Sequence, residues 1–68
     1  MPNEDKVHKL FVFSLGDKAR LKLTQEQGEI IARSQHLNAE NMYRLRYVCA
    51  DGRMVEDWWT ESALVAVN

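Results

Sequence analysis

Two segments of this chain alternate strictly between apolar and charged side chains. In residues 18–23 and again in residues 43–47, every second residue is apolar and each residue between is Lys or Arg. Side chains of a β-strand point to opposite faces with a period of two, so each segment predicts a strand with one buried and one cationic face. A helix would scatter the same residues around its circumference. The sequence therefore predicts a β-sheet protein.

The other expected strands are shorter or less regular. We expect them at residues 29–33, 54–60 and 64–67, with residues 61–63 too short for more than one 3-10 turn. Residues 10–15 are apolar and β-like up to a Gly16-Asp17 turn signal, and residues 34–41 are typical of a loop. Asp51-Gly52 is the pattern of a two-residue type I′ hairpin turn. The sequence predicts five strands.

Length and cysteine content limit the class of protein. The 68 residues allow one small domain, which we place at residues 9–68 behind a polar tail at residues 1–8. Cys49 is the single cysteine, so no internal disulfide can form, and no spacing of Cys and His indicates a zinc site. The polar start does not resemble a signal peptide. We expect a cytoplasmic protein without a metal or other cofactor.

Closure would protect the edges of so small a sheet, which favours a barrel. The predicted fold is all-β, a small five-stranded SH3-like barrel with one short 3-10 turn before the last strand. Three segments carry a resemblance: the Gly-Asp turn with its alternating strand (16–23), a Gly-initiated strand (28–33), and an aromatic strand, Asp-Gly turn, tryptophan strand and Glu-x-x-Leu ending (47–64). The chain resembles the small uncharacterised YodC-like proteins of bacteria and prophages. That resemblance implies the fold and a bacterial or prophage origin, but no activity.

The adjacent tryptophans are the strongest functional feature. On a strand, one indole must face the core and the other the outside, and we expect Trp59 to point inward and Trp58 outward. The alternative is that both indoles cap the ends of a barrel. An exposed tryptophan favours a contact with another protein. We therefore predict a non-catalytic binding or adaptor module, monomeric or weakly dimeric, that uses Trp58 and the loops at 34–41 and 51–53. The candidate residues are Trp58, Tyr43, Asn41 and Arg53.

The uneven charge distribution suggests an alternative function. Residues 18–46 carry six basic and three acidic groups, whereas residues 47–68 carry one basic and four acidic groups. If the two cationic strand faces were contiguous, they could follow a phosphate backbone. The overall charge of −1 is unlike that of a dedicated nucleic-acid module. The candidate nucleic-acid-binding residues are Lys18, Arg20, Lys22, Arg44 and Arg46.

Two further chemistries are weaker. Tyr43, Tyr47 and Trp58 could form an aromatic cage for a cationic ligand, but the alternation assigns both tyrosines to the core. The acidic residues near the tryptophans could suggest acid–base catalysis. A protein of this size has little room for the water-excluding pocket that such catalysis needs, and no base accompanies Cys49. We therefore expect no enzyme activity.

Overall fold

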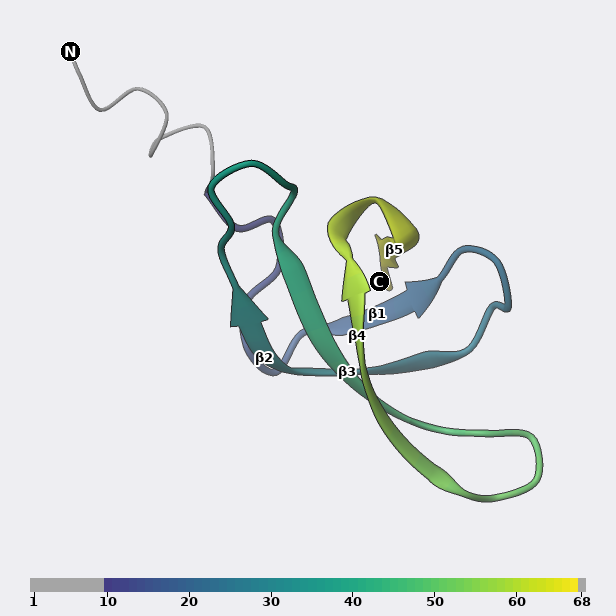
Figure 1. The fold of residues 1–68 in the computed structure, drawn as a ribbon. Helices are drawn as coiled ribbons and strands as arrows, with labels where there is room; N and C mark the ends of the chain where they lie inside the picture. Colours follow the sequence, from purple (N-terminus) through teal and green to yellow (C-terminus); the bar gives the residue numbers. More distant parts are fainter. Residues whose placement is uncertain (1–9, 68) are drawn as a thin grey trace, which may run out of the picture.

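The computed structural model describes residues 10–67 and shows an all-β molecule (Figure 1). Its described strands are β1 (Lys18–Leu21), β2 (Gln27–Ser34), β3 (Met42–Val48), β4 (Met54–Thr60) and β5 (Leu64–Ala66). The 3-10 turn η1 (Glu61–Ala63) lies between β4 and β5. The predicted all-β class and the turn before the last strand are thus confirmed. The predicted tail, residues 1–8, lies outside the described residues.

The described strands form one antiparallel sheet in the order β4-β3-β2-β1-β5. β4 and β5 are its two edges, and no pairing joins them among residues 10–67. The closed barrel expected from the sequence is therefore not observed, and the sheet is open. The three-residue β5 pairs with β1 at Ala19, Arg20 and Leu21.

One face of the sheet carries the core. Alternate residues of β3 point to this inner face, where Tyr43 and Leu45 are fully buried and Tyr47 is nearly so. Ile30 of β2 and Leu64 of β5 pack with them. Burial of each large apolar side chain stabilises the fold by about 1.5–3 kcal/mol. The alternation of residues 43–47 predicted this buried face correctly.

Gly28 lets β2 and β3 approach each other closely. It pairs with Tyr47 of β3 and with Ala19 of β1. A Cβ atom added at position 28 would lie 2.3 Å from the backbone oxygen of Arg46 and 2.9 Å from the Tyr47 Cβ. A Cβ atom can avoid these two contacts only if the backbone moves. β2 also contains a bulge between Ile30 and Ala32, which bends the strand.

Residues 10–15 do not form the strand that their apolar pattern suggested. They run as an irregular segment that packs through Phe13, which is buried, and Phe11, which is partly buried. The Tyr43 hydroxyl accepts hydrogen bonds from the Val12 and Phe13 amides, at 2.9 and 3.4 Å, and donates one to Glu61. These side-chain contacts satisfy backbone groups that a sheet ladder would otherwise take.

Two local expectations were also wrong. β1 ends at Leu21, and Leu23, which the alternation assigned to the core, is 94% exposed in the following turn.

The loop between β3 and β4 is not the expected type I′ turn. In it, the Cys49 amide donates to the Arg53 oxygen and the Gly52 amide to the Cys49 oxygen. Only Gly52 of this loop has a positive φ, +92°, so the connection is a three-residue loop ending in a left-handed glycine. A type I′ turn would need a positive φ at Asp51 as well.

Within residues 10–67, no helix is long and apolar enough to cross a membrane.

Candidate protein-binding surface

The hairpin of β3 and β4 presents a solvent-facing surface opposite the core. Its register pairs Val48 with Met54, Arg46 with Glu56, Arg44 with Trp58, and Met42 with Thr60. Directly paired residues of antiparallel strands share a face, and the intervening residues of β3 are the buried ones. We call these eight side chains the hairpin outer face. They are Met42, Arg44, Arg46, Val48, Met54, Glu56, Trp58 and Thr60.

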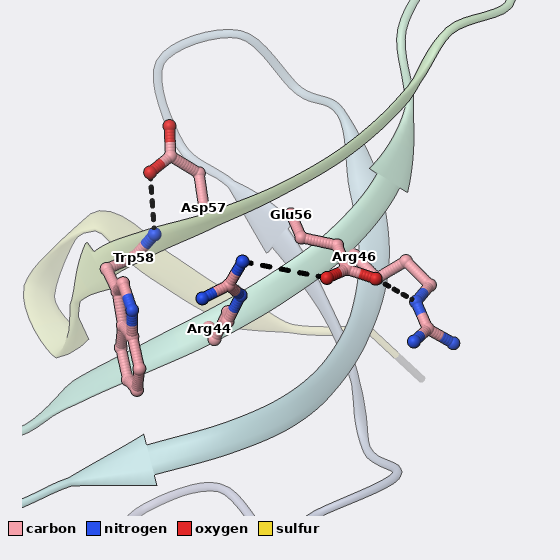
Figure 2. A network of polar contacts seen from close by, with 5 residues as sticks. All are labelled: Arg44, Arg46, Glu56, Asp57 and Trp58. Carbon is pink, nitrogen blue, oxygen red and sulfur yellow. Dashed lines mark hydrogen bonds and ion pairs between the residues drawn. The ribbon is translucent and has the colours of Figure 1, made fainter.

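A small ion network occupies the centre of the hairpin outer face. Figure 2 shows the Glu56 carboxylate between two guanidinium groups: Arg46 Nε lies 2.9 Å from one oxygen and Arg44 lies 3.6 Å from the other. All three side chains are more than a third exposed, so water and salt screen the attraction. The network therefore contributes little to stability, and Arg44 lies opposite Trp58 in the strand register.

Trp58 and Trp59 lie on opposite faces of β4, in the predicted sense. Trp58 is 37% exposed on the hairpin outer face, whereas Trp59 packs against the core. In Figure 2 the Trp58 ring projects from one side of β4 and the Asp57 side chain from the other. The expectation that Trp59 points inward and Trp58 outward is confirmed. The alternative, in which both indoles cap the ends of a barrel, assumed a closed barrel, whereas the sheet is open.

The far end of the hairpin is apolar and exposed. Val48 and Met54, which pair directly, are 55% and 60% exposed. They border a shallow depression of about 400 Å³ on the sheet surface. Its other lining residues include cations and an anion, so the depression combines an apolar end with a polar rim. The remaining lining residues are Lys18, Gln27, Gly28, Glu29, Arg46 and Tyr47.

Two of the four predicted protein-binding residues have structural roles instead. Tyr43 has no exposed surface, and burial, together with the hydrogen bond to Glu61, raises the pKa of its hydroxyl above its ordinary value. Asn41 is 4% exposed, and its side chain donates to the Leu10 oxygen at 3.3 Å. These side chains cannot reach a partner because they are buried against residues 10–13. The loop interpretation of Asn41 missed this because its partner lies 31 residues away.

Arg53 is accessible but lies away from Trp58. It sits in the hairpin loop, and its Nε lies 2.8 Å from Asp51. Hydrogen bonds from the Arg53 side chain and amide lower the pKa of the Asp51 carboxyl. Arg53 and Trp58 are five positions apart along an extended chain, a distance of about 16 Å. The two residues therefore fit one ligand only if that ligand runs along β4.

The predicted cationic stripe is not continuous. β2 lies between β1 and β3, and Glu29 of β2 pairs with Lys18 on one side and with Arg46 on the other. Glu56 then follows Arg46 on β4. The row across the sheet thus alternates in sign, from Lys18 through Glu29 and Arg46 to Glu56. Lys22 lies beyond the end of β1. Such a row does not offer the uniform positive potential that phosphates need.

The proposed aromatic cage does not form either. Tyr43 and Tyr47 lie on the core face and Trp58 on the opposite face, so the three rings cannot surround one ligand. Among residues 10–67, it is the Arg33 guanidinium that lies over a ring, 4.4 Å from the centre of the Phe11 ring. Among residues 10–67, no group of three or more His, Cys, Asp or Glu side chains is placed to hold a metal ion.

Sequence reasoning overlooked the free edge of β4. The Glu61 amide donates to the Asn41 oxygen, and the Cys49 amide to the Arg53 oxygen, so the odd-numbered residues of this ladder face β3. Bonding alternates along an antiparallel pair, and the backbone groups of the even-numbered β4 residues therefore point away from the sheet. The expectation of a closed barrel concealed this edge. The even-numbered β4 residues whose backbone groups point outward are Met54, Glu56, Trp58 and Thr60.

No family model, curated protein or solved structure matches this chain. What the hairpin outer face can bind is therefore inferred from its own residues.

Proposed function

We propose that this protein is a small non-catalytic binding module that contacts a protein partner through Trp58 and the hairpin outer face. The single observation that carries the proposal is the exposure of Trp58 beside Arg44 and the Glu56 ion network. Tryptophan and arginine are the residue types that most often dominate binding energy at protein interfaces. Exposed Val48 and Met54 extend the apolar area along the same face. A cytoplasmic setting is part of the proposal.

The fold supports a further part of the proposal. We infer that the sheet is an opened form of an SH3-like barrel, of the kind found in the YodC-like proteins that the chain resembles. Its five antiparallel strands and the 3-10 turn between β4 and β5 agree with the layout expected of such a barrel. A bacterial or prophage origin is proposed on the same resemblance.

Nucleic-acid binding is the weaker candidate. It would use Arg44 and Arg46, but both already neighbour Glu56. Binding to phosphates releases counterions and becomes steeply salt-dependent, whereas a contact anchored by an indole depends little on salt. Salt dependence is therefore the property that separates the two functions.

The proposal is tested by capture from extracts of the cell that encodes the chain. We expect the wild-type protein and the control Leu23→Ala to retain the same partner, because Leu23 is 94% exposed in the turn after β1, outside the hairpin outer face. Trp58→Ala should lose it, with a cost in binding of about 2 kcal/mol or more. Circular dichroism must show that Trp58→Ala remains folded. Equal retention by Trp58→Ala would remove Trp58 as the anchor.

A further inference from the structure

The free edge of β4 gives the proposed binding surface a defined chemistry. Met54, Glu56 and Thr60 direct their N–H groups away from β3, and these groups have no partner among the described residues. The side chains of these three residues belong to the hairpin outer face. An incoming strand would therefore bond to the backbone of β4 and place alternate side chains beside Trp58 and Met54. Recognition of extended peptides at sheet edges works in this way.

Asp57 gives the edge a charge preference. Its carboxylate accepts the Trp58 amide at 2.9 Å and has no ion-pair partner within residues 10–67. The Trp58 amide is an edge group, so an incoming strand must take over this donor. The released carboxylate would then face the residue opposite Asp57. An acidic or neutral residue there would leave the charge uncompensated, whereas Lys or Arg would pair with it.

We infer that β4 binds an extended basic segment of the partner by adding it to the sheet as an antiparallel sixth strand. The segment places an apolar residue opposite Trp58, a Lys or Arg opposite Asp57, and a second apolar residue opposite Met54. Its pattern is therefore apolar, basic, any, any, apolar. This inference rests on the proposed function and specifies how the partner is held and what chemistry it carries.

A second copy of this chain would meet charge repulsion at the edge in two of its registers. Two-fold pairing of β4 with itself, centred on Asp57 or on Glu56, would place identical negative charges directly opposite each other. Like charges at such positions destabilise a strand pair. A basic segment meets no such repulsion and pairs with Asp57, and we assign the edge to such a segment of another chain. Sedimentation of the protein alone should show a monomer, and a dimer that Trp58→Ala dissociates would overturn this assignment.

The direct test uses a synthetic peptide, acetyl-Thr-Ile-Lys-Thr-Thr-Ile-Thr-amide, titrated into isotope-labelled protein and followed by NMR. We expect shifts at the amides of Met54, Glu56, Trp58 and Thr60, and the Trp58 amide should become protected from exchange. Methylation of the backbone nitrogen of the first Ile, which faces β4, should weaken binding about tenfold. Methylation of the Lys nitrogen, which points away from β4, is the matched control and should have little effect.

Charge exchange tests the role of Asp57. Replacing the peptide Lys by Glu should weaken binding, and the variant Asp57→Lys should restore it. Glu29→Gln is the control, because it removes an acid from β2, away from the edge and on the sheet face opposite Asp57. Equal loss from methylation at either nitrogen would overturn strand addition while leaving the Trp58 contact intact. Absence of shifts in β4 would also overturn it, and the cell-extract capture would then decide the proposed function separately.

Discussion

At the scale of single residues, position 28 has no room for a methyl group. Gly28→Ala places its Cβ against the backbone oxygen of Arg46, so β2 and β3 must separate. Overpacking of this kind typically costs about 1–3 kcal/mol. Gly52→Ala is the control, because its φ of +92° is strained for alanine although nothing lies within 4 Å. Urea denaturation should show the larger loss of stability at Gly28. A larger loss at Gly52 would contradict the close approach of the strands.

Tyr43 makes stability depend on alkaline pH. Burial and the hydrogen bond to Glu61 raise the pKa of Tyr43, and burial raises that of Tyr47, above the ordinary value of 10.0. The folded protein thus holds these protons more tightly than the unfolded chain. Their contribution is fully present below pH 10.0 and is lost as the pH rises through the folded-state values. Urea midpoints should therefore fall above about pH 10.

The variant Tyr43→Phe isolates this effect. It leaves the Val12 and Phe13 amides without their acceptor, so we expect it to cost about 1–3 kcal/mol at neutral pH. Its midpoint should then fall less steeply than that of the wild type in alkaline solution. An identical alkaline slope in the two proteins would show that the Tyr43 hydroxyl does not contribute.

At the scale of secondary-structure elements, β4 should show alternating hydrogen exchange. The amides of Val55, Asp57 and Trp59 bond to β3, whereas those of Met54, Glu56 and Thr60 face solvent. We expect protection of the first three and rapid exchange of the last three, measured by NMR in deuterated buffer. Uniform protection along β4 would mean that its free edge is covered.

The strands whose side chains alternate were the most predictable elements. Residues 43–47, which alternate strictly, fall within β3, and their apolar positions are the buried ones. Contacts between distant residues were not predictable, such as that of Asn41 with Leu10. The prediction that Leu23 belongs to the core was wrong because β1 ends two residues before the alternating segment does. Periodicity determines which face a side chain takes, but neither where a strand ends nor which strand lies beside it.

At the scale of the whole molecule, charge is arranged in alternation across the sheet. Lys18, Glu29, Arg46 and Glu56 succeed one another on four neighbouring strands. Knowledge of the strand order was needed to see this, because the basic residues are clustered in the sequence. We expect short single- and double-stranded DNA to cause no salt-dependent NMR shifts at these residues. Steep salt-dependent shifts at Arg44 and Arg46 would instead favour nucleic-acid binding.

The central claim is that the β4 side of the molecule is where a protein partner binds. The most direct measurement replaces Met54, 60% exposed at this edge, with a photoreactive amino acid and identifies adducts in living cells. The same probe at Leu23, 94% exposed beyond the end of β1, is the control. We predict a protein adduct from position 54 that position 23 does not give and that Trp58→Ala abolishes. Adducts formed only at position 23, or only with nucleic acid, would contradict the account.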